Sequence, residues 1–130
     1  ADKPRFYAEA FRVLKPGGVL GLSNGASGEN GPPYFPVPWA ASAETSFLSS
    51  IAETRQDIVA AGFAVEQFRD ATDDIRAQVA ANRQRIEQEG LPALSLQVLI
   101  PRIKEYLVNS MRNIEDGRVR MVEVLARKPA

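Results

Sequence analysis

A short segment rich in aromatic residues and prolines, Tyr34-Phe-Pro-Val-Pro-Trp39, has the clearest capacity for binding chemistry in this sequence. Proline fixes one backbone angle, so the two prolines hold the neighbouring aromatic side chains on a stiff chain. The face of an aromatic ring attracts a cation, and a group of rings excludes water from a bound molecule. The segment therefore suits a cationic amine. The alternative is structural: Tyr34, Phe35 and Trp39 pin a long loop to the core.

The absence of two reactive residue types limits the reactions that this sequence could catalyse. It contains no cysteine and no histidine, which excludes disulfides, thiolate metal sites, cysteine nucleophiles and the most common general base. Any chemistry must use carboxylates, tyrosines, lysines or simple positioning of reactants. Glu29 and Glu44 are the carboxylates nearest to the aromatic segment, and nothing marks either as a base. We therefore predict no metal site and assign no catalytic residue.

Length and charge are those of an ordinary globular domain. The 130 residues make one domain at most, and 45% of them are apolar. Lysine plus arginine equals aspartate plus glutamate, at 16 each, so no net field attracts nucleic acid or an anionic membrane. No apolar run approaches the roughly 20 residues of a membrane-spanning helix. We expect neither nucleic acid nor membrane as a partner, and a cytoplasmic location.

The residues before the aromatic segment predict a helix, a sharp turn and a strand. Apolar residues recur at three- and four-residue intervals from Pro4 to Leu14, which is helical spacing. Pro16 cannot continue a helix, and the two glycines after it suit a tight reversal. The apolar run Val19-Leu-Gly-Leu22 then predicts a short strand covered on both faces. This pattern is half of an α/β unit.

A long loop separates this strand from the next helix. Glycine, proline, serine and asparagine crowd the stretch from Asn24 to Ala43, and a loop of this length is more often functional or mobile than a mere connection. Its glycines lack the spacing of a dinucleotide-binding loop, so we predict no phosphate site there. A helix is predicted from Glu44 to Ala61, with Ser42 as its N-cap and with Phe47 and Leu48 in its apolar stripe.

Strands and helices alternate again in the remaining chain. Three elements follow a predicted strand at 63–69: a peripheral helix from Thr72 to Gly90, a final helix from about Leu94 to Glu115, and a last strand from Arg118 to Ala126. The final helix has a continuous apolar stripe that predicts good packing. Strict alternation in the strand at 63–69 places three of its side chains on one face: Phe63, Val65 and Gln67.

The run Phe6-Tyr-Ala-Glu-Ala-Phe-Arg-Val-Leu-Lys-Pro-Gly-Gly18 resembles the helix and turn before the fifth strand of class I S-adenosylmethionine-dependent methyltransferases. The part from Arg12 to Gly18 is fairly specific for this superfamily. The resemblance continues through Ala61-Gly-Phe63 to the C-terminus, so it covers nearly the whole chain. It covers only the second half of the family's domain. The segment Pro36-Val-Pro-Trp-Ala40 is also similar to one in small-molecule methyltransferases of type 11.

This resemblance implies an α/β fold, namely the C-terminal half of a Rossmann-like methyltransferase fold. We expect a three-stranded mixed sheet, with its last strand antiparallel and inserted between the other two, and about four helices. Residues 1–130 would be the C-terminal part of the domain, with residues 72–116 as a helical excursion between the last two strands. The family binds S-adenosylmethionine on its first two strands, which this chain lacks. We therefore expect the cofactor in the full-length protein and none on this chain alone.

The implied function is methyl transfer to a small molecule, with this C-terminal fragment supplying the acceptor-side loop and helices and inactive by itself. In the family, the segment after the fifth strand closes over the methyl acceptor, and the last helix tends to carry asparagine and arginine. The last-helix residues are equally suited to bonding the long loop or facing solvent. The candidate substrate-binding residues are Tyr34, Phe35, Trp39, Asn109, Arg112 and Asn113. The alternative function is a non-catalytic binding or assembly module that retains the half-fold.

The strand at Val19–Leu22 predicts an assembly. In the family this strand lies inside the sheet, and without its neighbour it becomes an apolar edge with unpaired backbone groups. We expect the missing N-terminal half or a second copy of the chain to pair there, and hence a dimer or larger oligomer of the chain alone.

Overall fold

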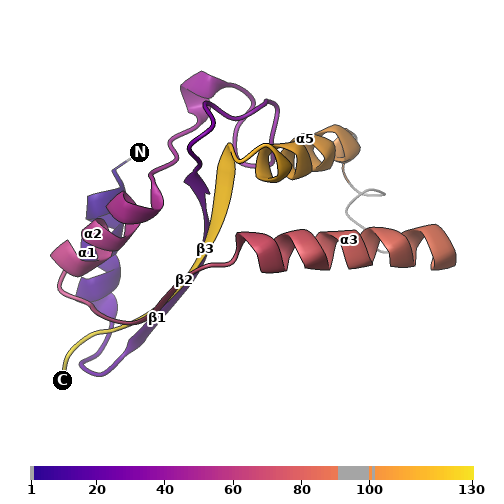
Figure 1. The fold of residues 1–130 in the computed structure, drawn as a ribbon. Coiled ribbons are helices and arrows are strands. Elements are labelled where there is room, and N and C mark those ends of the chain that lie inside the picture. The colour runs from indigo at the N-terminus through magenta and orange to yellow at the C-terminus, as the bar shows by residue number, and fades with distance from the viewer. Residues whose placement is uncertain (1, 91–99, 101) are drawn as a thin grey trace. The chain divides into compact units, whose positions relative to one another are not determined.

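The computed structural model describes residues 2–90, 100 and 102–130, and its elements alternate between helix and strand as in an α/β protein (Figure 1). The predicted fold class is confirmed. The elements in chain order are α1 (Lys3–Val13), β1 (Val19–Ser27), the 3₁₀ turn η1 (Ala43–Thr45), α2 (Ile51–Ala60), β2 (Ala64–Asp70), α3 (Thr72–Glu89), α5 (Ile103–Glu115) and β3 (Val119–Arg127).

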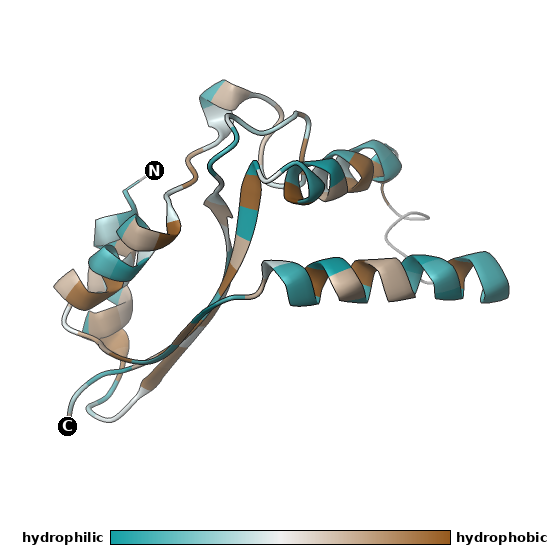
Figure 2. Cartoon of the chain, viewed as in Figure 1, coloured by the Kyte–Doolittle hydropathy of each residue, from teal (hydrophilic) through white to brown (hydrophobic). Residues whose placement is uncertain are grey.

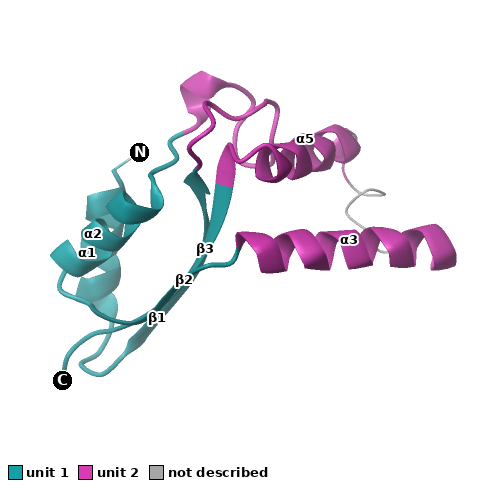
Figure 3. Cartoon of the chain, in the orientation of Figure 1, with its two compact units in different colours: residues 1–27, 47–71, 120–130 teal, residues 28–46, 72–119 magenta. Residues whose placement is uncertain are grey.

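The chain forms two compact units, which are described separately (Figure 3). The first unit contains residues 1–27, 47–71 and 120–130, and so holds α1, α2 and nearly all of the sheet. The second contains residues 28–46 and 72–119. The predicted excursion at 72–116 therefore shares its unit with the long loop after β1.

The sheet of the first unit has the predicted strand order. Its order is β1-β3-β2, so the last strand of the chain lies between the other two. β3 runs antiparallel to β2 along pairs from Ala64 with Arg127 to Asp70 with Val122. Just before β1 begins, the N–H of Gly17 donates a hydrogen bond of 2.8 Å to the carbonyl oxygen of Lys128, which follows β3. Gly17 has a φ of 77°, and this left-handed conformation explains why glycine suits the predicted turn.

One face of this sheet is covered by α1 and α2, which lie side by side (Figure 1). Their apolar side chains pack against the inward residues of the strands, and each buried aliphatic or aromatic side chain stabilises the unit by about 1.5–3 kcal/mol. The buried members of this core are Tyr7, Ile58, Phe63, Val124 and Ala126. Burial, with Asp57 nearby, raises the pKa of Tyr7.

The first strand differs from its prediction in length and in burial. β1 continues to Ser27, so the loop begins later than Asn24. Leu20 and Leu22 pack on the core, whereas Val19 is 40% exposed on the other face. The prediction of a strand covered on both faces was wrong for this chain, because within the first unit helices cover only one side of the sheet.

The second helix begins later than predicted. Residues 46–50 are not helical, Phe47 is exposed, and α2 starts at Ile51. The cause is a capping box, in which Ser50 Oγ accepts a hydrogen bond from the backbone N–H of Glu53 at 3.2 Å. The Glu53 carboxylate in turn accepts bonds from the N–H and Oγ of Ser50 at 2.8 and 2.9 Å. These hydrogen bonds lower the pKa of Glu53. Ser42 precedes the short η1 instead.

A bulge in β2 breaks its predicted alternation. The pairing with β3 shifts between Val65 and Gln67, so that Val65 and Phe68 both pack on the core while Gln67 leaves it. The prediction that Val65 and Gln67 share a face was wrong, because one extra residue in a strand reverses the side-chain direction beyond it.

The described residues of the second unit include the helices α3 and α5 and the loop at 28–46. α3 is mainly hydrophilic (Figure 2), and most of its residues are exposed, as predicted for a peripheral helix. Its Arg76 Nη2 donates to the carbonyl oxygen of Ile114 on α5 at 3.1 Å. The predicted beginning of the final helix falls on 91–99 and 101, outside the described residues. Within α5, Ile103 and Ile114 are buried, but Leu107 is 38% exposed, so the predicted continuous stripe packs only in part.

Candidate functional site

Two asparagines of α5 hold the backbone of the aromatic segment. Asn113 Oδ1 accepts a hydrogen bond from the N–H of Tyr34 at 2.6 Å, and Asn113 Nδ2 donates to the carbonyl oxygen of Tyr34 at 3.1 Å. Asn109 Nδ2 donates to the carbonyl oxygen of Pro36 at 2.9 Å. One side-chain amide therefore replaces the partner that Tyr34 would find in a neighbouring strand.

The two asparagines lie about one turn apart on α5. Residues four apart on a helix share a face and are separated by about 6 Å along its axis. Asn109 and Asn113 can therefore bond to residues 34 and 36 from one face of α5. Asn113 is fully buried, so its amide and the backbone of Tyr34 satisfy each other where water does not.

The ring of Tyr34 lies between two arginines. The guanidinium carbons of Arg112 and Arg118 are 4.1 and 4.2 Å from the ring centroid. The Tyr34 hydroxyl donates to Asp116 Oδ2 at 2.9 Å, and Arg118 Nη1 donates to the carbonyl oxygen of Pro32 at 2.7 Å. The Tyr34 ring, whose face attracts cations, is therefore already in contact with two arginines of the same unit.

Trp39 stands at the tip of a tight turn that begins after this anchored stretch. Val37 and Ala40 exchange backbone hydrogen bonds of 2.9 and 3.1 Å, and both residues are buried. Between them, Trp39 is 42% exposed, and its Nε1 donates to Ser46 Oγ at 3.3 Å. The buried, paired residues Val37 and Ala40 thus hold the partly exposed indole of Trp39 on a two-residue turn.

The structure brings together four of the six predicted site residues. Asn113 and Arg112 contact Tyr34 itself, and Asn109 bonds to the same segment at Pro36. Phe35 is half-buried, and Trp39 is exposed at its turn. Sequence reasoning missed Arg118 and Asp116, which complete the surroundings of the Tyr34 ring. An Asp-Gly pair is typical of a turn, so Asp116-Gly117 indicates a turn after the helix. No local pattern predicts that this turn contacts a loop far back in the chain.

The glycine-rich stretch after β1 does not fit a nucleotide or its phosphates. A Cβ on Gly28 would lie 2.1 Å from the carbonyl oxygen of Gly117, so glycine is needed there for the close approach of two chain segments. The N–H groups of Gly28 and Asn30 donate to the carbonyls of Arg118 and Gly117 at 2.8 and 3.3 Å. Two of the backbone donors that a phosphate-binding loop would offer are thus used within the fold, and we assign no cofactor to this stretch.

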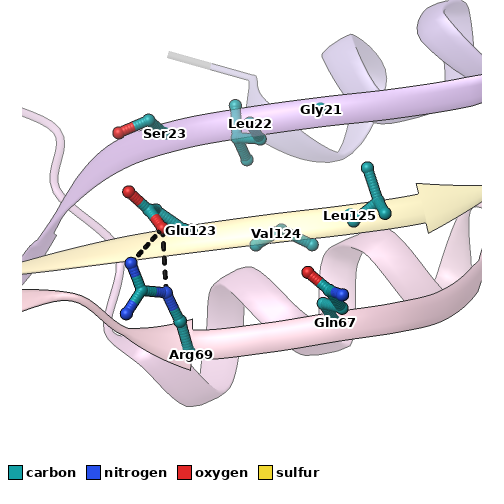
Figure 4. Close-up of a pocket in the computed structure, with 8 residues that line it drawn as sticks. All are labelled: Gly21, Leu22, Ser23, Gln67, Arg69, Glu123, Val124 and Leu125. Atoms are coloured by element: carbon teal, nitrogen blue, oxygen red, sulfur yellow. Dashed lines mark hydrogen bonds and ion pairs between the residues drawn. The ribbon is translucent and has the colours of Figure 1, made fainter.

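A hollow of about 440 Å³ lies on the uncovered face of the first unit's sheet (Figure 4). Arg69 and Glu123 lie across it, with Arg69 Nε and Nη2 donating to Glu123 Oε2 at 2.9 and 2.7 Å. Gly21 contributes open space, since an added Cβ would meet nothing within 4 Å. The charges of Arg69 and Glu123 are paired with each other, so nothing marks this carboxylate as a catalytic base.

The part of the chain that the structure describes shows neither a candidate metal site nor a membrane-spanning helix. There, no three or more carboxylates gather into a group able to hold a metal ion. No described helix combines the length and apolar character needed to cross a bilayer. Glu29 and Glu44, the carboxylates nearest in sequence to the aromatic segment, are both exposed.

Comparison with known proteins gives matches to solved structures alone. No protein-family model and no curated protein matches the chain. Phosphoethanolamine N-methyltransferase 2 of Haemonchus contortus, solved with phosphomonomethylethanolamine and S-adenosylhomocysteine, is 18% identical with a TM-score of 0.72, and the match covers 99% of this chain and 30% of that chain.

Two further structures extend this similarity. A cyclopropane synthase of Mycobacterium tuberculosis is 17% identical with a TM-score of 0.62, and the match covers 97% of this chain and 50% of that chain. Geranyl diphosphate C-methyltransferase of Streptomyces coelicolor, solved with S-adenosylhomocysteine, is 16% identical with a TM-score of 0.62, over 98% of this chain and 43% of that chain. This chain thus spans half or less of each of these structures. It has the fold of part of an S-adenosylmethionine-dependent methyltransferase.

Proposed function

We propose that this chain is the C-terminal, acceptor-side portion of a methyltransferase that transfers a methyl group from S-adenosylmethionine to a small molecule. The observation that carries the proposal is the match of nearly the whole chain, at a TM-score of 0.72, to a structure holding both a small methyl acceptor and the spent cofactor. The resemblance of the Arg12–Gly18 run to the family supports it independently.

The loop at 28–46 and α5 are the parts that we assign to the acceptor. Trp39 is the partly exposed aromatic of the segment, and its indole face offers an apolar and cation-attracting surface. Phe35 adds apolar lining. Tyr34, through its contacts with Arg112 and Asn113, and Asn109, through its bond to Pro36, form the frame of the site. Reaction would depend on holding the acceptor close to the methyl group and excluding water.

An amine is the first acceptor that we propose. The chain has no histidine, and an amine that arrives deprotonated needs no general base, whereas a hydroxyl acceptor does. The H. contortus enzyme carries N-methyltransferase in its name and the S. coelicolor enzyme C-methyltransferase. These names keep the acceptor atom open between nitrogen and carbon, and a panel of acceptors decides it.

We assign the cofactor to the rest of the protein. S-adenosylmethionine supplies an electrophilic methyl group when bound, but the glycine-rich stretch of this chain does not fit it. The known structures are at least about twice as long as the matched region, which leaves room for a cofactor site elsewhere. We therefore expect this chain alone to be inactive and to act with its missing N-terminal half.

The free edge of β1 is where we place a partner. β1 is at the end of the strand order β1-β3-β2, so it has no strand neighbour on its other edge among the described residues. An edge strand invites pairing with another strand. In the chain alone, we propose that a second copy pairs there and produces a dimer or larger assembly.

The activity is tested with methyl-labelled S-adenosylmethionine and a panel containing an amine, a phosphorylated amine, a phenol and a prenyl diphosphate. The protein is the chain extended at its N-terminus, with Trp39→Leu as the site variant and Phe47→Leu, an exposed aromatic outside the site, as the control. We expect transfer to an amine that Trp39→Leu weakens and Phe47→Leu preserves. Absence of transfer to every acceptor would contradict the proposed function.

The second candidate is a non-catalytic binding or assembly module, and the open edge of β1 is the observation that favours it. Such a module would assemble through β1 without any cofactor. If the extended protein neither binds S-adenosylhomocysteine nor transfers methyl groups, yet still assembles through this edge, the module is the better description.

A further inference from the structure

The strongest unexplained feature of the second unit is a fully buried asparagine whose side chain serves only the backbone of a loop. Asn113 gives both its acceptor and its donor to Tyr34, at 2.6 and 3.1 Å. An aliphatic residue would pack at such a position without needing partners, and a substrate-binding residue would present a polar atom to solvent or to a cavity. Asn113 has no exposed surface.

We infer that Asn113 and Asn109 are positioning residues, which set the place of the Trp39 turn by fixing residues 34–36 before it. The inference rests on the proposed function, because it assigns the acceptor contact to Trp39 and gives the two asparagines a role through it. It differs from the prediction that these asparagines touch the substrate themselves.

The connection between the asparagines and Trp39 is short and stiff. Asn109 bonds to the carbonyl of Pro36, and the next residue, Val37, is the buried base of the turn that presents Trp39. Pro36 and Pro38 each restrict one backbone angle of this connection. A displacement at residues 34–36 is therefore transmitted to Trp39 instead of being absorbed by free rotation.

The chemistry of the amide explains why asparagine is needed. Aspartate has the same size and keeps the acceptor for the N–H of Tyr34, but it lacks the donor and turns a charged oxygen toward the carbonyl of Tyr34. Leucine removes both bonds and leaves both backbone groups without a partner in a buried place. Asn113→Asp thus tests the donor with almost no change in shape.

Trp39 itself reports the result, because it is the only tryptophan of the chain. Its emission maximum and its quenching by acrylamide measure how exposed the indole is. We expect Asn113→Asp to shift the emission to longer wavelength and to increase quenching, while circular dichroism shows retained helix. Asn82→Asp is the matched control, since Asn82 is an exposed asparagine of α3, and it should leave Trp39 unchanged.

Unchanged Trp39 emission and quenching in a folded Asn113→Asp variant would overturn the inference. If that variant does not fold, Asn109→Asp decides, because Asn109 is only half-buried and gives the loop a single bond. An unaltered Trp39 signal in Asn109→Asp would overturn it equally. The fluorescence readout needs no cofactor or acceptor, so failure of the positioning role is distinguishable from failure of the methyl-transfer assay.

A kinetic readout tests the same role in the extended protein. Asn113→Asp should raise the KM for the acceptor about fivefold, which corresponds to about 1 kcal/mol, with a smaller effect on kcat. An unchanged KM together with a lowered kcat would contradict positioning through the acceptor-contacting turn.

Discussion

The hydroxyl of Tyr34 donates a hydrogen bond of 2.9 Å to Asp116, on the turn that follows α5. Arg112 and Arg118 lie over the ring of the same tyrosine at 4.1 and 4.2 Å. Tyr34 therefore joins the loop to both sides of the turn between α5 and β3. It acts as an anchor for the loop even though it belongs to the segment proposed for acceptor binding.

Two replacements of Tyr34 separate the stability that comes from its hydroxyl hydrogen bond from the stability that comes from its ring contacts. We expect Tyr34→Phe to lower the free energy of unfolding by about 1 kcal/mol through loss of one hydrogen bond. Tyr34→Leu also loses two cation–π contacts and should cost about 2 kcal/mol or more. Urea denaturation of the two variants measures the difference. Equal stability of Tyr34→Leu and Tyr34→Phe would show that the arginine contacts contribute nothing.

Lys128, near the C-terminus of the chain, caps the C-terminal end of α1. Its Nζ donates to the carbonyl oxygens of Phe11 and Leu14 at 2.7 and 2.8 Å. These carbonyls have no partner within the helix. Lys128→Met should lower the free energy of unfolding by about 1–3 kcal/mol, whereas Lys104→Met, at an exposed position of α5, should change little. Thermal unfolding of both variants checks the prediction, and equal melting temperatures would contradict it.

The start of α2 should depend on pH through Glu53. The pKa of this carboxyl is below its ordinary value of 4.5 because Ser50 donates hydrogen bonds to it. Since the folded pKa is lower than the unfolded one, the stabilisation is complete above about pH 4.5 and is lost as the pH falls through the folded value.

The variants Glu53→Gln and Ser50→Ala test this dependence. Glu53→Gln should remove the part of the acid sensitivity that comes from this carboxyl, and Ser50→Ala should cost about 1 kcal/mol at neutral pH through the lost cap. Urea denaturation at several pH values measures both, with Glu44→Gln as the exposed control. An identical pH profile for Glu53→Gln and the wild type would count against the capping box.

Proline substitutions test assembly through β1 at two neighbouring positions whose backbone N–H groups point to opposite edges of the strand. The carbonyl oxygen of Gly18 accepts a hydrogen bond from the N–H of Lys128, on the β3 side of the strand. The N–H of Ser27 donates to the carbonyl oxygen of Ser49, away from β3. Alternation along the strand then directs the N–H of Ser23 toward the free edge and that of Leu22 toward β3.

Ser23→Pro should therefore block the edge and yield a monomer with retained secondary structure. Leu22→Pro should disrupt the sheet itself. Light scattering at micromolar concentration, with circular dichroism, compares both variants with the wild type. A wild-type chain that is already a monodisperse monomer would contradict assembly through this edge.

Much of the fold could be predicted from the sequence because its signals are local. Helical spacing placed α1, and the Lys15-Pro-Gly-Gly18 turn placed the start of β1. The position of β3 between β1 and β2 came from the resemblance to methyltransferases. Periodicity alone does not reveal which strands pair, since pairing depends on residues that are distant in sequence.

The errors have physical causes that single-sequence patterns do not contain. The capping box of Ser50 and Glu53 overrode the apolar stripe that extended the helix back to Glu44. The bulge after Val65 reversed the side chains beyond it. For the candidate site, the types of residue were predicted, but the contact of Arg118 with Tyr34 could not be, because it depends on how a loop and a distant turn meet.

Calorimetric titration of S-adenosylhomocysteine tests the central claim most directly. The ligand is added to this chain and to a version extended at its N-terminus. We predict no heat of binding with this chain and saturable binding with the extended version, which would place the cofactor site outside the acceptor-side portion. Tight binding by this chain alone would contradict the account, because the cofactor site would then lie among residues assigned here to the acceptor side.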